Sequence, residues 1–381
     1  MTSSAPRCRF PVVLTLCVLF CNSVARQRAL EVGLSSKITR HSLEAQRLVE
    51  PLLECGARTV WDLNCVRILE GKQSTEAGLG HQLSELVFFA KLSQLHGAAL
   101  RFSPFTAAIS NHFAEYAFVN DLLGLRRLTS NTHVDTTLLR EVRFNESASE
   151  EECGVLYTGD YRSCPGGNCF EAVTMARAFE QFAPCLRVES YRTGSWWMHN
   201  PYREHTFAVV WHVRVGDITP HLATDPFFSN ILKGIEGSLK HVPNTHHFVV
   251  GNWAVAHAET LKGFKSMFKR LFVNHTYDLL DLDIRSTLLH LLHADVLIGT
   301  GSSLTSTIPL FSGKPLVFNV KPKHGWNHLA EYYSDGIDVS PDGHILTPKY
   351  LLASLLKARS TGQPFKRSVG KVKATYYTYG G

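Results

Sequence analysis

Apolar residues recur along the first half of the chain with two different periods. A short apolar run at 65–69 predicts a strand, and a run of helical period follows from Leu83 to Leu95. Gly97 is a typical helix end, and the next apolar run, at 98–102, predicts a second strand. The pattern therefore predicts a βαβ unit, and the turn Gly78–Gln82 lies directly before its helix.

The alternation becomes regular from residue 205 onward. Strands are predicted at 207–213, 248–250, 271–273, 295–298 and 315–318. Helices are predicted at 228–239, 256–270 and 284–293, with a closing helix at 350–359. Strands that alternate with helices of this length form a doubly wound parallel sheet. Residues 105–200 show no such alternation, and we assign them to the remainder of the first domain.

The length of the chain, 381 residues, predicts two domains, because a single core rarely grows so large. The predicted parts are a signal segment, an N-terminal α/β domain that carries disulfides, a C-terminal Rossmann-like domain, and a terminal helix with a tail. Their boundaries are 1–25, 26–204, 205–345 and 346–381.

The N-terminus has the pattern of a secretory signal. Arg7 and Arg9 precede an apolar stretch at 10–20, and the small residues at 23–25 offer a cleavage site. An uncleaved signal anchor, which would tie the protein to the membrane, is the alternative. Cleavage would lower the net charge from +6 to +4, because residues 1–25 carry two arginines and no acids. No long basic block follows, so nucleic-acid binding is not expected.

Three of the nine cysteines lie in the signal segment, and the other six all precede residue 190. An even number in an oxidising compartment predicts disulfides, with a local bridge between Cys164 and Cys169 as one pairing. A zinc site is the alternative. Two glycosylation sequons begin at Asn145 and Asn274 and agree with a secretory chain.

Candidate chemistry follows the strand predicted at 207–213. His212 and Arg214 stand at the carboxyl end of this strand, where open α/β sheets bind their ligands, and Gly216 and Asp217 follow. The guanidinium of Arg214 is a fixed cation with several donors, which suits a phosphate. A surface ion pair between Arg214 and Asp217 is the structural alternative.

Two glycine-rich turns add to this motif. Gly299-Thr300-Gly301 opens a predicted helix at Ser302, Ser303, Leu304 and Thr305, where amides and hydroxyls can hold a phosphate. Simple N-capping is the alternative there. In the first half, Gly78-x-Gly80 permits close backbone approach, and His81 can act as an acid or a base.

The order of these motifs resembles that of the fucosyltransferase superfamily, which embraces α1,2-, α1,6- and protein O-fucosyltransferases. The resemblance lies in Gly-x-Gly-His-Gln at 78–82, His-x-Arg-x-Gly-Asp at 212–217, and Ala294-Asp295 followed by Gly-x-Gly-Ser-Ser at 299–303. It implies a GT-B-like α/β fold, in which two Rossmann-like domains face a central cleft. It also implies an inverting transfer from GDP-fucose that needs no metal and no other cofactor.

The resemblance assigns roles to individual residues. It implies that Arg214 binds the donor pyrophosphate and that His212 lies near the nucleotide. An inverting transfer also needs a base for the acceptor hydroxyl, for which His81 is the candidate and Glu76 and Glu85 are the weaker alternatives. Further donor-binding candidates are Gly78, Gly80, Gln82, Asp217, Asp283, Thr287, Ser302, Ser303, Leu304 and Thr305. The N-terminal domain would then take the acceptor, a glycan or glycoprotein, in the lumen of the Golgi or endoplasmic reticulum. A secreted protein is the alternative location.

The chain departs from the family pattern at three points. Val215 replaces a frequent second arginine, and His81 replaces the usual asparagine. Thr287, with Asp283 a turn earlier, stands near the place of the acidic residue that reads guanine. These departures leave open a transferase for another nucleotide sugar, or an inactive glycan-binding protein on the same fold.

Overall fold

In the computed structural model, the residues described below lie in one compact unit, Pro51–Gly381. They are 67–71, 78–103, 105, 117–129, 136–143, 153–159, 172–193, 200–214, 224–253, 258–300, 302–313, 315–320 and 336–361. The signal segment, Asp217, Gly301 and the Cys164–Cys169 pair lie outside them. Among the described residues, no helix is both long and apolar enough to cross a membrane.

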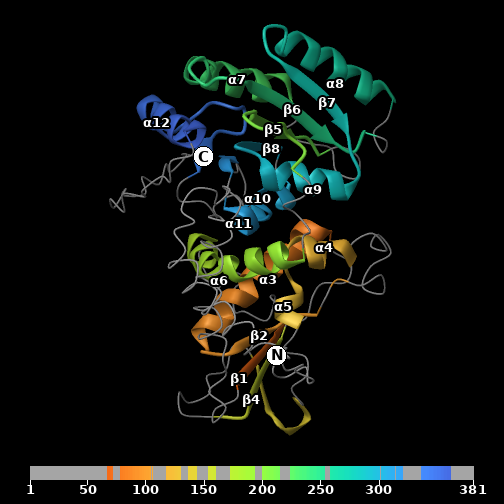
Figure 1. Ribbon diagram of the computed structural model, residues 1–381, viewed down its shortest axis with the longest axis vertical. Coiled ribbons are helices and arrows are strands. Elements are labelled where there is room, and N and C mark those ends of the chain that lie inside the picture. Colours follow the sequence, from red (N-terminus) through yellow and green to blue (C-terminus); the bar gives the residue numbers. More distant parts are fainter. Residues whose placement is uncertain are drawn as a thin grey trace, which may run out of the picture. The chain divides into compact units, whose positions relative to one another are not determined.

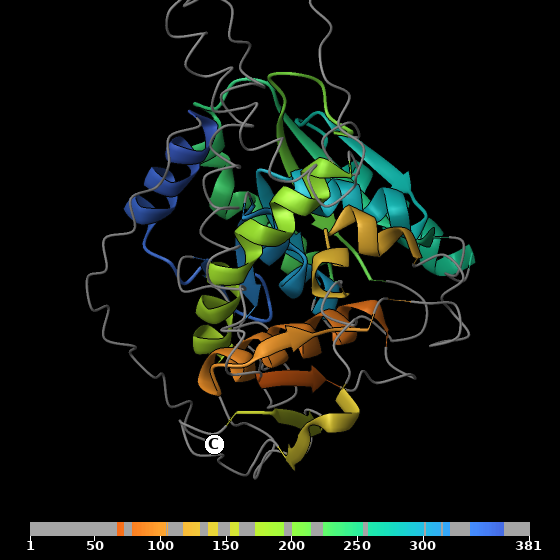
Figure 2. The same cartoon turned by 60° about the horizontal axis from the view of Figure 1, so that its bottom comes forward.

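The first sheet is built on the predicted βαβ unit. Strand β1 (Arg67–Gly71) pairs in parallel with β2 (Ala99–Arg101), and helix α3 (Leu79–Leu95) connects them. Strand β4 (Val155–Gly159) pairs with the other side of β1, and β3 (Arg140–Arg143) pairs with β4. The order is β2-β1-β4-β3 with every pair parallel, and Figure 2 shows these strands, orange to yellow-green, side by side.

The segment 105–200 contains more regular structure than its sequence pattern predicts. Besides β3 and β4 it forms α4 (Ala117–Leu122), α5 (Arg126–Thr129), a 3₁₀ turn at Thr136–Leu138 and the long helix α6 (Ala172–Arg192). Pro184 lies inside α6, where a proline removes one backbone donor and argues against a helix. Burial of Phe179, Ala183 and Leu186 compensates, because tertiary packing outweighs local propensity.

The second sheet is doubly wound and entirely parallel, as predicted. Its order is β10-β9-β8-β5-β6-β7. The strands are β5 (Phe207–His212), β6 (Thr245–Gly251), β7 (Tyr277–Asp281), β8 (Val296–Gly299), β9 (Leu316–Val320) and β10 (Ile337–Val339). Together the two parallel sheets confirm the predicted α/β class.

Helices cover both faces of the second sheet (Figure 1). Val209 and Trp211 of β5 pack in the same cluster as α7 (Asp225–Leu239), α8 (Ala258–Leu271) and α12 (Lys349–Ser360). Ala208 and Val210 pack in the other cluster with α9 (Ile284–His293), α10 (Ser303–Thr307) and α11 (Pro309–Ser312). Because both faces are covered, β5 is buried along its whole length, which explains its unbroken apolar run.

The strand predicted at 271–273 is wrong. Leu271 ends α8, and Phe272–His275 form a turn in which the amide of His275 donates to the carbonyl of Phe272 at 2.9 Å. Phe272 is apolar because its ring packs on Trp211 and Phe268, not because it lies in a strand. The strand of this region is β7, whose charged and half-buried residues do not form an apolar run.

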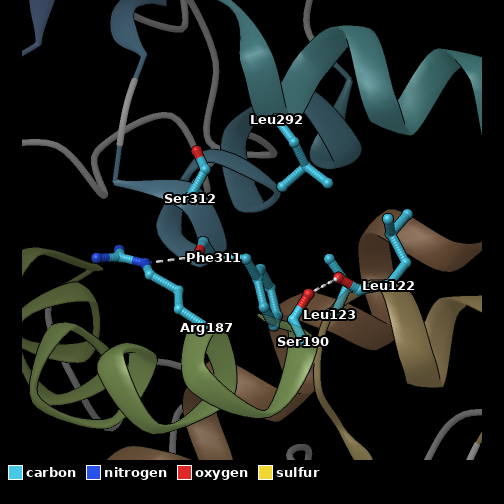
Figure 3. Close-up of a pocket in the computed structure, with 7 residues that line it drawn as sticks. All are labelled: Leu122, Leu123, Arg187, Ser190, Leu292, Phe311 and Ser312. Carbon is cyan, nitrogen blue, oxygen red and sulfur yellow. Dashed lines mark hydrogen bonds between the residues drawn. The ribbon is translucent and has the colours of Figure 1, made fainter. Parts of the chain in front are cut away.

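Helix α6 of the first half is bonded to α11 of the second half. The Nε atom of Arg187 donates to the carbonyl of Phe311 at 2.6 Å (Figure 3). The Nη2 atom of Arg187 donates to the carbonyl of Leu310 at 3.1 Å. These are carbonyls at the end of α11, where no further helical turn can satisfy them. A cavity of about 10 Å³ lies beside this contact, close to the room that one water molecule needs.

Candidate functional site

The chain changes direction within the second sheet between β5 and β8. From β5 it winds outward through β6 and β7, and it then returns to the other side of β5 to begin β8. Such a switch point leaves a crevice at the carboxyl ends of the two strands, which is where open α/β sheets bind ligands. His212 and Gly299 are paired in register at these two ends.

The segments that follow the two strands are hydrogen-bonded to one another. The amide of Thr300 donates to the carbonyl of His212 at 3.2 Å, and the amide of Arg214 donates to the hydroxyl of Thr300 at 3.1 Å. The backbone of Arg214 is thus fixed at the switch point, with its side chain only partly buried. Thr300 is a site residue that the motif analysis did not single out, although its place directly after a buried strand is a signal for it.

The side chain of His212 reaches helix α10. Its Nδ1 atom lies 2.6 Å from the hydroxyl of Thr305, and both residues are buried. Burial, helped by the charge of Arg214, lowers the pKa of His212 from 6.5 to about 4, so the ring is neutral at neutral pH. A Cβ atom on Gly299 would lie 2.8 Å from Cβ of Thr305, which explains why a glycine occurs here.

The turn that begins α10 is occupied by its own capping contacts. Ser302 is the N-cap, and its hydroxyl accepts from the amide of Leu304 at 3.3 Å. The carbonyl of Ser303 accepts from the hydroxyl of Thr307 at 2.7 Å. Ser302 and the amide of Leu304 therefore make the contact of a helix N-cap, as in the capping alternative. The hydroxyl of Thr305 instead lies within hydrogen-bond distance of His212.

The glycine turn of the first half lies against this same turn. A Cβ atom on Gly80 would lie 2.6 Å from Oγ of Ser303 and 2.7 Å from Cα of Leu304. One turn further along α3, the hydroxyl of Ser84 lies 3.0 Å from that of Thr307. The structure thus brings together two motifs that are more than 200 residues apart in the sequence.

The remaining residues of the first turn differ in exposure. Gly78 is the exposed N-cap of α3, and Gln82 is buried. The side chain of His81 is 38% exposed, and its Nε2 atom lies 3.4 Å from Oε1 of Glu85, whose side chain is only 2% exposed. The histidine proposed as the base is therefore paired with a buried carboxylate one helical turn away. Only the i, i+4 spacing of the two residues could have indicated this pair from the sequence.

Asp283 and Thr287 lie beyond the carboxyl end of β7. Because all strands of this sheet are parallel, this end is on the same edge as the ends of β5 and β8. Asp283 is the N-cap of α9, and its carboxylate accepts from the amide of Ser286 at 2.6 Å, which lowers the pKa of Asp283. Thr287 is buried, and its amide donates to the carbonyl of Asp283.

The described residues contain no cluster of three or more histidine, cysteine, aspartate or glutamate side chains placed to hold a metal ion. The two cysteines in the described part of the chain, Cys153 and Cys185, are disulfide-bonded.

Comparisons with known proteins return structural matches of low sequence identity. No protein-family model matches the chain, and no curated protein matches it. Among solved structures, a mutant of Arabidopsis thaliana FUT1, a fucosyltransferase, in complex with GDP is 10% identical, with a TM-score of 0.35 over 75% of this chain and 76% of that one. The Escherichia coli heptosyltransferase WaaC with ADP is 11% identical, with a TM-score of 0.40 over 77% and 100%.

A third match is the N-terminal domain of Candida albicans trehalose-6-phosphate phosphatase. It is 11% identical, with a TM-score of 0.24 over 87% of this chain and 73% of that one. Two of these three proteins are glycosyltransferases of the GT-B class. These three TM-scores are all below 0.5. The fold of this chain is therefore described from its own strand order and not from these matches.

The contact between α3 and α10 predicts a penalty for any side chain at residue 80. Gly80→Ala should lower the free energy of unfolding by about 1–3 kcal/mol, because the new Cβ atom meets backbone atoms of Leu304 that cannot move aside freely. Gly78→Ala is the matched control, since no atom lies within 4 Å of a Cβ atom there. Urea unfolding measures both variants. Equal stability of the two would contradict the close contact.

The buried histidine predicts a loss of stability in acid. The unfolded chain takes up a proton on His212 near pH 6.5, and the folded protein does so only near pH 4. Stability is therefore complete above pH 6.5 and falls as the pH drops toward 4. His212→Asn should remove about 2 kcal/mol of the loss between pH 7 and pH 5, measured by urea unfolding. If both proteins lost the same unfolding free energy between pH 7 and pH 5, the pKa of His212 would be equal in the folded and unfolded states. That result would contradict the lowering of this pKa by burial.

Proposed function

We propose that the chain is a glycosyltransferase that binds a nucleoside diphosphate sugar at the carboxyl ends of β5 and β8. The observation that carries this proposal is the arrangement at the switch point. Arg214 is held there through its own amide by Thr300, beside a neutral His212 that is bonded to Thr305. A partly buried guanidinium at this edge of the sheet attracts an anion such as a phosphate.

Arg214 is suited to the step in which the donor breaks. In glycosyl transfer an acceptor hydroxyl oxygen bonds to the anomeric carbon, the bond from that carbon to the phosphate oxygen breaks, and the nucleoside diphosphate leaves. Negative charge grows on the leaving phosphate during this step, so a preorganised cation there lowers the barrier more than it strengthens ground-state binding. We assign this role to Arg214.

The acceptor hydroxyl must lose its proton in an inverting transfer. We propose His81 as the base, because it is partly exposed and begins the helix that contacts the turn at α10. The Nε2 atom of His81 lies 3.4 Å from Oε1 of Glu85, and we assign the uptake of the acceptor proton to the other ring nitrogen, Nδ1. Glu85 is then a positioning residue that holds the imidazole ring and stabilises its charge after the transfer.

For the donor we propose GDP-fucose, on the resemblance of the three motifs to the fucosyltransferase pattern. The ionised carboxylate of Asp283 lies on the ligand edge of the sheet, where an acceptor of hydrogen bonds from guanine is needed. The acceptor class is a glycan or glycoprotein, and the proposed location is the lumen of the secretory pathway, Golgi or endoplasmic reticulum. A transferase for a different nucleotide sugar is the second candidate, favoured by Val215 in place of a second arginine.

Nucleotide binding tests the site directly. GDP should raise the melting temperature of the purified protein more than UDP or ADP does. Arg214→Ala should weaken GDP binding by about ten- to a hundredfold, because a charged hydrogen bond to phosphate is lost. Arg203→Ala, at an exposed arginine just before β5, is the matched control and should bind GDP normally. A well-folded protein that no nucleotide stabilises would overturn the proposed function.

The pair in α3 predicts a defect in turnover rather than in binding. His81→Ala should lower kcat by about 10²–10⁴-fold, and it should leave GDP binding unchanged, because the base acts on the acceptor. Glu85→Gln should lower kcat by less, since the histidine remains. GDP release from GDP-fucose in the presence of an acceptor panel measures both variants, with His241→Ala as the exposed control. An unchanged kcat in His81→Ala would remove this residue as the base.

A further inference from the structure

The exposed turn before β7 carries one of the two sequons. Asn274 and Thr276 are both exposed, and the turn is closed by the bond from the amide of His275 to the carbonyl of Phe272. Next to the asparagine, the side chain of Val273 is 73% exposed, which is unusual for an apolar residue in this fold. The other sequon, at Asn145, lies outside the described residues.

The position of this turn suits a large modification. Thr276 precedes β7, and its carbonyl accepts from the amide of His247 near the start of β6. The turn is therefore at the amino ends of the parallel strands, whereas His212 and Arg214 lie at the opposite edge. A bulky group on Asn274 would leave the proposed nucleotide site open.

A bulky group at this turn would also protect the edge of the second sheet that is formed by β7. Strand β7 is the last strand in the order, and within the described part of the chain it pairs with β6 alone. An edge strand with free backbone groups is a place where other chains can add, and proteins protect such edges. A hydrated glycan beside Val273 would screen both the apolar side chain and the start of this edge.

We propose that Asn274 carries an N-linked glycan, an inference that rests on the proposed location in the secretory lumen. The amide nitrogen Nδ2 of Asn274 bonds to the anomeric carbon of an oligosaccharide activated as a lipid-linked pyrophosphate. The bond from that carbon to the pyrophosphate oxygen breaks, one amide proton is lost to a base, and the lipid pyrophosphate leaves. The reaction is catalysed by a membrane-bound oligosaccharyl transferase of the host cell.

The test uses the full chain with its own N-terminus, produced in eukaryotic cells. Asn145→Gln removes the other sequon, and an Asn-Gly-Thr reporter is added after Gly381. Gel mobility before and after treatment with peptide N-glycosidase then counts the glycans. We expect two glycans in the Asn145→Gln protein that carries the reporter. We expect one glycan when Asn274→Gln or Thr276→Ala is added to it. Thr276→Ser, which keeps the sequon, should retain two.

Mass spectrometry of the treated protein adds a readout that needs no substitution, since the enzyme converts a glycosylated asparagine to aspartate. A glycosylated reporter with an unmodified Asn274 would overturn the proposal. Absence of a glycan from both Asn274 and the reporter would overturn it as well, because the chain would then not enter the lumen. GDP binding by the enzymatically deglycosylated protein is measured in parallel, and it separates a failure of the glycan proposal from a failure of the proposed function.

Discussion

The bond between His212 and Thr305 is the contact on which the candidate site depends. It joins the end of the central strand to the helix that follows the neighbouring strand, and it does so between buried groups. Burial keeps the imidazole neutral, and the absence of a side chain on Gly299 leaves room for Thr305. With Thr300 closing the same junction, the backbone of Arg214 has one position at the switch point of the sheet. This hydrogen bond fixes the backbone from which the Arg214 side chain extends at the carboxyl end of β5.

A second constraint ties the first half of the chain to this junction. Gly80 of α3 lies so close to Ser303 and Leu304 that no side chain fits. The partly exposed His81 follows immediately, and its partner Glu85 is buried one turn along the helix. A residue proposed for proton transfer is thereby placed by the same contact that brings two distant motifs together. The edge with Asn274, at the opposite ends of the strands, has no part in this arrangement.

The sequence predicted those features that depend on short-range pattern. The apolar run of β5 and the helix at 284–293 predicted the second sheet, and the period of α3 predicted the βαβ unit of the first, because burial on two faces leaves a visible pattern. Strands β3 and β4 of the first sheet lie in 105–200, where no such pattern is visible. Helix α6 was missed because Pro184 lies within it, and packing outweighs that signal. Phe272 was assigned to a strand because an aromatic residue in a turn that packs inward looks like a strand residue. The motifs named His212, Arg214 and Gly80, but the contacts of Thr300 and of the Leu304 amide depend on the fold.

Hydrogen exchange of backbone amides with and without GDP tests the location of the site most directly. We predict that GDP slows exchange in peptides covering 211–217 and 299–305, with lesser protection at the start of α3. The same experiment on Arg214→Ala should show no protection at the GDP concentration that protects the parent protein. Protection confined to the sheet of β1–β4, or an exchange pattern that GDP leaves unchanged, would contradict a nucleotide site between β5 and β8.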